Sequence, residues 1–176
     1  VFDQVIQDWD AKMATNPENE KFSAFEVGIN TRSNDGMLAG SFNFYSTSWS
    51  DRIQTRTVQN ENGDDDIIYL TGINQVHSGI ESEFAAQLND MFRIDIGLSL
   101  GNWTLTEDAK GTYRDSDGTD QEYNYALKDL KAGDAPQSSI SLGLTAKPVD
   151  GSIVQVSYRF YDDFYADWSP SSREYS

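Results

Sequence analysis

The chain has 176 residues, 29 acidic against 13 basic side chains, a formal net charge of −16 and no cysteine. Such an acidic balance excludes nucleic acid as a partner, because few side chains could neutralise a run of phosphates. The lack of cysteine excludes disulfides, thiol catalysis and thiolate metal sites. Apolar residues make up 38% of the chain, which predicts a folded protein. The mean hydropathy of −0.60 does not exclude a membrane strand, which is apolar only at alternate positions.

The first 21 residues are polar and mixed in character. Residues 4–14 could form a short amphipathic helix, with Val5, Ile6, Trp9 and Met13 on one side. A polar stretch containing Pro17 then ends it. We therefore expect residues 1–21 to be a loop or short helix, on the extracellular side in the membrane interpretation developed below.

Three pairs of segments with period-two alternation follow, and each pair is joined by a short connection. Apolar side chains occupy every second position, which is the pattern of antiparallel strands with one polar face. Turn residues such as glycine, asparagine and aspartate occur at 33–37, 89–90 and 147–151. The sequence therefore predicts an all-β antiparallel up-and-down meander of about six strands, at residues 25–32, 38–44, 80–88, 92–101, 140–146 and 154–160.

The connections alternate in length, with the long ones at residues 51–74 and 102–137. Outer-membrane barrels have short periplasmic turns and long extracellular loops in the same way. The apolar side of these six strands carries no charge. A strand from Phe92 to Leu100, tilted near 45°, rises about 21 Å, close to an apolar band about 25 Å tall. We therefore expect residues 22–170 to be three hairpins of a larger transmembrane β-barrel, with residues 171–176 beginning an extracellular loop.

Aromatic residues lie near the ends of strands that adjoin the long loops. A belt of tryptophan and tyrosine at the lipid headgroups is typical of membrane barrels. These positions support the outer membrane of a Gram-negative bacterium as the location, and its lipid as a partner. They are Tyr45, Trp49, Trp103, Tyr161, Phe164, Tyr165 and Trp168.

Four stretches resemble TonB-dependent outer-membrane receptors, and the resemblance covers about residues 22–170. Residues 42–52 (FNFYSTSWSDR) and 158–167 (YRFYDDFYAD) are similar to passages from a barrel strand into an extracellular loop. Residues 70–81 (LTGINQVHSGIE) and 129–137 (DLKAGDAPQ) are similar to the segments that re-enter the barrel. All four are patterns of the barrel strands, which say nothing of the cargo.

The resemblance implies a barrel of about 22 strands with a plug domain in its lumen. It also implies energy supplied through the TonB complex, and a scarce nutrient as cargo: a siderophore, vitamin, glycan or peptide. About six strands are fewer than the roughly eight that close a membrane barrel. We therefore expect the chain to be an internal fragment of a receptor, whose plug and TonB contacts belong to other parts of the polypeptide. An enzyme and a bound cofactor are not expected.

Ligand contacts are expected from aromatic side chains on the long loops, where a ring could stack on a sugar or a planar chelate. The candidates are Trp103, Tyr113, Tyr123, Tyr125 and Trp168. Charged residues on the polar side of the strands are expected to face the lumen and the plug, with Glu81 and Glu83 pairing with Arg93 or Arg159. This set is Glu81, Glu83, Arg93, Asp95 and Arg159.

Signals for catalysis or metal binding are weak in this sequence. His77 is the single histidine and is expected to be structural rather than catalytic or metal-ligating. An EF-hand reading from Asp115 fails, because position six would be Asp120 and position twelve Ala126. No metal site is expected, although carboxylate-rich loops leave weak calcium binding open. The alternative to a receptor is a soluble all-β module that binds a ligand or carbohydrate.

Overall fold

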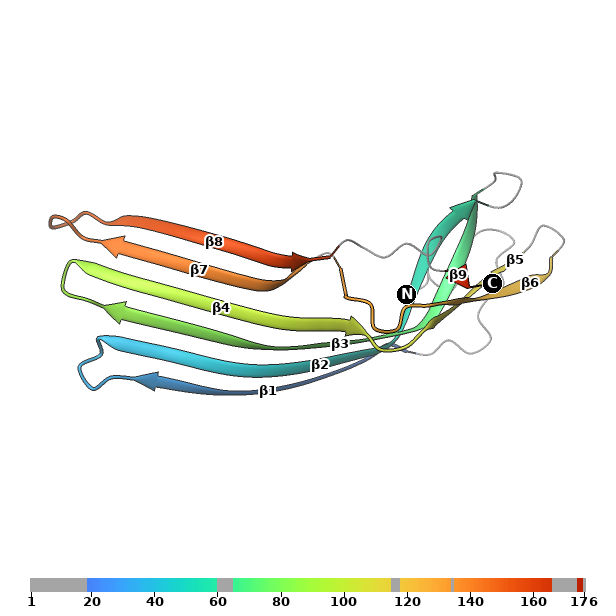
Figure 1. The fold of residues 1–176 in the computed structure, drawn as a ribbon, viewed down its shortest axis with the longest axis horizontal. Helices are drawn as coiled ribbons and strands as arrows, with labels where there is room; N and C mark the ends of the chain where they lie inside the picture. Colours follow the sequence, from blue (N-terminus) through green and yellow to red (C-terminus); the bar gives the residue numbers. More distant parts are fainter. Residues whose placement is uncertain (1–18, 60–64, 115–117, 134, 166–173, 176) are drawn as a thin grey trace.

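The computed structural model describes residues 19–59, 65–114, 118–133, 135–165 and 174–175. In these ranges nine antiparallel strands form one sheet (Figure 1). No helix within the described ranges is long and apolar enough to cross a membrane. The all-β antiparallel meander is therefore confirmed. The helix expected over residues 4–14 lies outside the described residues. The strands are β1 (Lys21–Arg32), β2 (Leu38–Gln59), β3 (Asp65–Gln87), β4 (Phe92–Leu105), β5 (Ala109–Arg114), β6 (Asp120–Tyr125), β7 (Pro136–Ala146), β8 (Val154–Phe164) and β9 (Glu174–Tyr175).

The predicted hairpins form a continuous part of the sheet, which we call the wall. It consists of β1, residues 38–49 of β2, residues 75–87 of β3, β4, β7 and β8, paired in that order. The short connections β1–β2, β3–β4 and β7–β8 lie together at one end of the wall, on the left of Figure 1. Gly36 and Gly151 adopt positive φ angles of 72° and 79° in two of these turns, which glycine adopts without steric cost.

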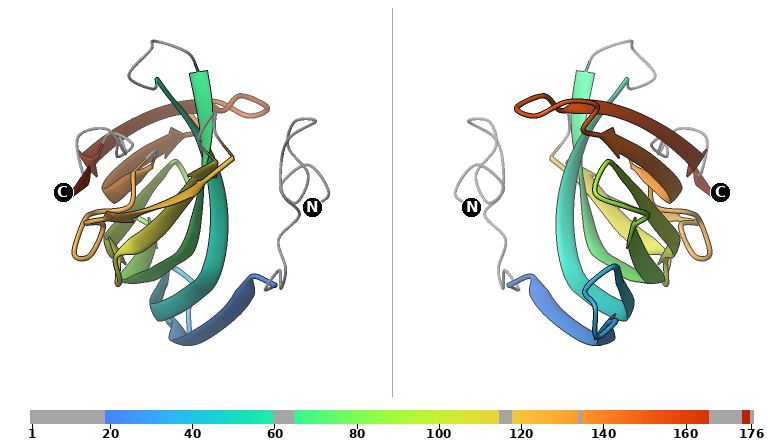
Figure 2. Two further views of the ribbon diagram at one scale, coloured as in Figure 1. Left: turned by 90° about the vertical axis from the view of Figure 1, so that its right-hand side faces the viewer. Right: turned by 90° about the vertical axis from the view of Figure 1, so that its left-hand side faces the viewer.

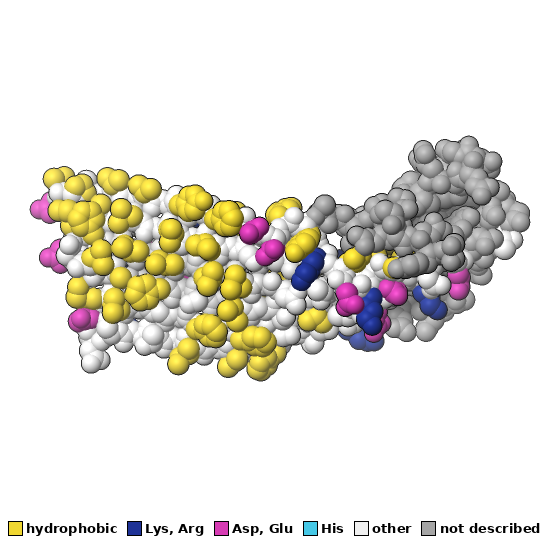
Figure 3. All heavy atoms as spheres, in the orientation of Figure 1, with side chains coloured by type: hydrophobic (Ala, Val, Ile, Leu, Met, Phe, Trp, Pro, Cys, Tyr) yellow, Lys and Arg dark blue, Asp and Glu magenta, His cyan; other side chains and the backbone are white. Residues whose placement is uncertain are grey.

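The strand register places the apolar side chains of the wall on one face. Phe44 lies opposite Ile80, and Ile80 opposite Leu100. Farther along, Ile96 lies opposite Leu142. Because side chains directly opposite each other in a sheet point to the same side, these residues form continuous apolar rows. Figure 3 shows hydrophobic side chains spread across this face, with the visible charged residues toward its ends.

The wall has no second layer among the described residues. Large hydrophobic side chains on its strands have exposed fractions up to 67%. The sheet is curved but not closed (Figure 2), and within the described residues β1 pairs only with β2 and β8 only with β7. The wall is therefore a curved single layer with an apolar face, a polar face and two unpaired edges.

Beyond the wall, the sheet continues as a second part, the distal sheet: residues 52–59 of β2, residues 65–73 of β3, β5, β6 and β9. The register of the β2–β3 pair shifts between Trp49 and Gln54, where Asp51 has a φ angle of 59°. The backbone N–H of Asp51 donates to Oδ1 of Asn74 at 2.8 Å. Figure 1 shows the β2–β3 hairpin bending away from the wall beyond this point, as expected of a bulge.

The buried hydrophobic core lies at the distal end. Leu70 and Ile73 of β3 pack with Leu105, Ala109, Tyr125 and Leu127. The carboxylate of Asp108 accepts the backbone N–H groups of Leu127 and Lys128, each at 3.0 Å. The segment after β6 is thereby fixed across the end of β4.

The distal sheet corrects the sequence prediction for the long loops. Residues 51–74 and 102–137 were expected to be mostly loop, but they contain the outer halves of β2 and β3 and all of β5 and β6. Residues 171–176 were expected to begin a loop, yet β9 pairs with β6 through Tyr125 and Glu174. These strands lack a regular apolar alternation, so their sequences carry no period-two signal.

Candidate functional site

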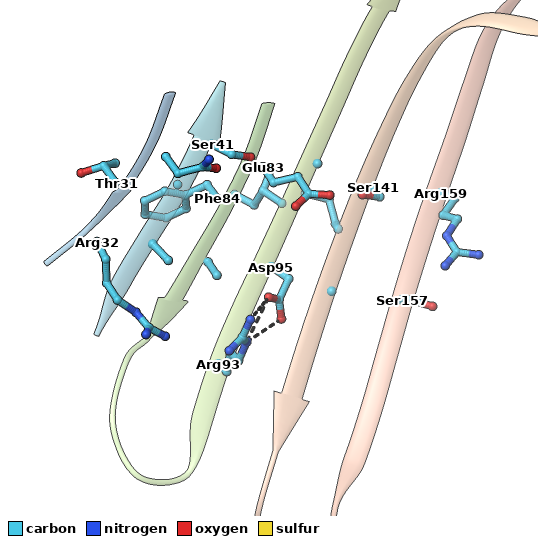
Figure 4. A pocket seen from close by; sticks show the side chains of 18 of the residues that line it. Thr31, Arg32, Ser41, Glu83, Phe84, Arg93, Asp95, Ser141, Ser157 and Arg159 are labelled. Carbon is cyan, nitrogen blue, oxygen red and sulfur yellow. Dashed lines mark hydrogen bonds and ion pairs between the residues drawn. The ribbon is translucent and has the colours of Figure 1, made fainter. Parts of the chain in front are cut away.

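The charged residues expected to face the lumen lie on the polar face of the wall. A hollow of about 710 Å³ occupies this face, and Glu83, Arg93, Asp95 and Arg159 are among its lining residues. Figure 4 shows their side chains over strands that also carry Ser41, Ser141 and Ser157. Small side chains leave the space: Gly97 lies opposite Ser141, and Gly143 lies opposite Asp95. The hollow is thus open and of mixed charge.

The ion pairing within the hollow differs from the expected one. Arg93 bonds to Asp95, with Nη2 donating to Oδ1 at 2.6 Å and Nε donating to both carboxylate oxygens at 3.0 Å. Glu81 and Glu83 were expected to pair with Arg93 or Arg159. The expectation is wrong for Arg93, which pairs with Asp95 instead. The reason is the register, because Arg93 lies opposite Gln87 and therefore four residues along β3 from Glu83.

An aromatic cluster stands on the same polar face where the wall meets the distal sheet. The side chains of Tyr45, Trp49, His77 and Trp103, which we call the ring platform, line a cavity of about 450 Å³. Tyr45 and Trp49 belong to β2, His77 to β3 and Trp103 to β4. His77 lies opposite both Thr47 and Trp103, so adjacent strands bring the rings together.

Two glycines give Tyr45 its place in the ring platform. Gly79 of β3 lies between its two neighbouring strands, opposite Tyr45 of β2 and opposite Gly101 of β4. A Cβ atom at Gly79 would lie 2.6 Å from the Tyr45 hydroxyl oxygen, and one at Gly101 would lie 3.2 Å from it. The tyrosine ring therefore occupies the space that side chains at these positions would fill. Nε1 of Trp103 donates to the Tyr45 hydroxyl at 2.9 Å and fixes the ring there.

His77 stacks on Trp103, with ring centroids 4.8 Å apart and planes 12° apart. Its Nε2 atom is buried and has no hydrogen-bond partner in the described structure. The imidazole therefore packs as a stacked ring within the ring platform.

Trp49 is held from three directions. Phe22 meets it edge to face with centroids 6.2 Å apart, and its Nε1 donates to Oε2 of Glu20 at 3.0 Å. The guanidinium carbon of Arg52 lies 3.9 Å from the ring centroid, a cation–π contact. Burial lowers the pKa of Arg52, while the charge of Glu20 opposes that change.

The five aromatic residues predicted as ligand contacts have different positions. Trp103 belongs to the ring platform. Tyr125 was expected to be exposed, but it is 2% exposed and lies in the distal core, so that expectation is wrong. Tyr113 and Tyr123 lie on β5 and β6, although their side chains are outside the described part. Trp168 lies outside the described residues.

Tyr45, Trp49 and His77 were not predicted to share one site. Tyr45 and Trp49 were expected in a headgroup belt, but both line the cavity on the polar face. The available signal was positional, since Tyr45 and Trp49 are four residues apart on one strand and so share a face. Their meeting with Trp103 depends on pairing between strands distant in sequence.

Among the residues that the structure describes, no group of three or more histidine, cysteine or carboxylate side chains could hold a metal ion. Residues 115–117, where the EF-hand comparison began, lie outside the described residues. No family model, curated protein or solved structure matches the chain. The receptor family therefore stays a prediction based on the strand patterns.

Proposed function

We propose that this chain is a section of the barrel wall of an energised outer-membrane receptor that imports a scarce nutrient. The observation that carries the proposal is the two-faced wall, with an exposed apolar face and a polar face on the same strands. In this account the apolar face contacts membrane lipid, and the polar face contacts the lumen. The protein is then located in the outer membrane of a Gram-negative bacterium.

Exposure of the apolar face distinguishes this proposal from a soluble binding module. Soluble monomers rarely expose apolar patches larger than a few hundred Å², and an antiparallel sheet in water normally buries its apolar face against a second layer. Here Phe25, Ile29, Leu142 and Val156 have exposed fractions of 61%, 67%, 45% and 62%. They lie on β1, β7 and β8 and share the apolar face of the wall, so lipid would cover all of them.

The two ends of the wall fit the two sides of an outer membrane. Tight turns would face the periplasm, and the distal sheet, with its own core, would stand on the extracellular side. The unpaired edges of β1 and β8 would pair with further strands of the same barrel, since exposed edges invite other pairing. A plug domain and the TonB complex would act through other parts of the receptor.

Single-cysteine labelling in cells that produce the protein tests this arrangement, because the chain has no cysteine of its own. Glu107→Cys lies at the distal end and Asp150→Cys in the β7–β8 turn. A membrane-impermeant maleimide should label Glu107→Cys on intact cells and Asp150→Cys only after the outer membrane is permeabilised. Equal labelling on intact cells would contradict a membrane between the two ends.

Transport requires its own measurement. Uptake of a ferric siderophore, cobalamin, a maltooligosaccharide and an oligopeptide is compared in cells that produce or lack the protein. A specific loss of one uptake activity in cells lacking the protein is the expected result. No difference for any of the four would remove the transport proposal while leaving the membrane arrangement in place.

A further inference from the structure

The cavity over the ring platform combines aromatic faces with negative charge. Glu26 and Glu81 line it together with Tyr45, Trp49 and Trp103, and no lysine or arginine is among its described lining residues. Glu26 lies opposite Tyr45 on β1. Glu81 lies two residues along β3 from Gly79, which is opposite Tyr45 on the other side. Carboxylates therefore stand on both sides of the tyrosine ring.

This combination selects for a positive ligand. A carboxylate accepts hydrogen bonds but donates none, and the negative face of an aromatic ring attracts a cation. Sugar hydroxyls and anions normally require donors as well, and the cavity offers few of them. The Tyr45 hydroxyl accepts a hydrogen bond from Trp103 and has a single proton to donate to a ligand.

The protein already contains one example of the same chemistry. The Arg52 guanidinium lies over Trp49, with its central carbon 3.9 Å from the ring centroid. Lys21 and Asp51 form an ion pair at 2.7 Å nearby on the paired strands β1 and β2. Arg52 thus places a cation against the Trp49 ring, while the described lining of the cavity contains carboxylates and aromatic rings but no lysine or arginine.

We propose that the cavity over the ring platform binds an organic cation, an alkylammonium group held by aromatic faces between Glu26 and Glu81. The positive group would lie against the fixed Tyr45 ring, and the carboxylates would neutralise its charge. If the proposed function is right, this is the point at which a cationic part of the cargo is held on the polar face. That role rests on the proposed function, whereas the binding itself does not.

Binding of choline to the full chain in detergent micelles tests the proposal. Choline is compared with 3,3-dimethylbutan-1-ol, which has the same shape without the charge, and with methyl glucoside. Tryptophan emission and the NMR signals of the single histidine report occupation of the platform. We expect choline to bind at least about tenfold more tightly than the uncharged alcohol.

Charge-neutral variants locate the site. Glu26→Gln and Glu81→Gln should each weaken choline binding about tenfold. Glu83→Gln is the matched control, since it removes the same charge from the same face of β3 but lies outside the cavity; it should change binding less than about twofold. Folding of all three variants is checked by circular dichroism, and Glu81→Asp, which keeps the charge, should retain most of the binding.

Several outcomes would overturn the proposal. They are equal binding of choline and the uncharged alcohol, binding of methyl glucoside in place of choline, no saturable binding at millimolar choline, or equal losses in Glu81→Gln and Glu83→Gln. Failure of choline binding with correct maleimide labelling would leave the membrane arrangement intact. Choline binding with equal labelling at both ends would leave the cation site intact and contradict the barrel wall.

Discussion

A methyl group added at Gly79 should disturb the ring platform more than one added at Gly143, which lies on the same polar face. In Gly79→Ala the new Cβ would lie 2.6 Å from the backbone oxygen of Leu100 and 2.6 Å from the Tyr45 hydroxyl oxygen. Neither distance is tolerable for carbon, so the β3–β4 pair must separate locally and the tyrosine ring must move. Overpacking of this kind costs about 1–3 kcal/mol.

The displaced ring should also lose its hydrogen bond from Trp103, which measures 2.9 Å and would contribute about 1 kcal/mol. The expected loss in the free energy of unfolding is therefore about 2–4 kcal/mol. Urea unfolding of the full chain in detergent micelles, followed by tryptophan emission, measures it. Gly143→Ala is the control, because a Cβ there would meet the Cβ of Asp95 at an ordinary 3.5 Å, and it should cost less than about 0.5 kcal/mol.

The reasoning would be refuted if Gly79→Ala were as stable as Gly143→Ala. A double-mutant cycle separates the two contacts at Gly79. In a Tyr45→Ala background, Gly79→Ala should cost less than in the native chain, because only the contact with Leu100 remains. An unchanged cost in that background would show that the methyl group does not displace the tyrosine ring.

Two further predictions concern the distal core and the ion pair. Leu127 is fully buried, so Leu127→Ala should cost about 2–5 kcal/mol, and urea unfolding should show a loss roughly half as large or less for Leu38→Ala, which is 47% exposed. The Arg93 and Asp95 side chains are 48% and 43% exposed, so Arg93→Gln should cost less than about 1 kcal/mol, and the cost should shrink in 1 M salt; a loss above 2 kcal/mol would show that the pair is shielded from solvent.

The wall strands were predictable because their signal is local. Phe92, Ile94 and Ile96 alternate with Arg93 and Asp95, and any pairing that puts one of these apolar residues on a face puts them all there. The turns were equally local, since Gly36 and Gly151 adopt the positive φ angles that glycine favours. These features fixed the number of wall strands and their faces before any pairing was known.

The distal sheet and the ring platform were not predictable in the same way. The strand β5 has its place because Leu70 lies opposite Gly111, a pairing between residues far apart in the sequence. Tyr125 lies opposite Ala109, so it joins the core only because β6 pairs with β5 and β5 with β3. Similarly, the space for the Tyr45 ring exists only because Gly79 and Gly101 face each other across two strands.

Spin labels along β7 test the central claim, which is that the two faces of the wall contact lipid and an aqueous lumen. Single labels are placed at successive positions from Ser139 to Thr145 of the protein in lipid bilayers, and collision with oxygen and with a polar nickel chelate is measured. The account predicts two period-two patterns of opposite phase, with oxygen maxima at Ile140, Leu142 and Leu144 and chelate maxima at Ser141 and Gly143. Chelate access to Ile140, Leu142 and Leu144 equal to that of Ser141 and Gly143 would place the apolar face in water and contradict the account.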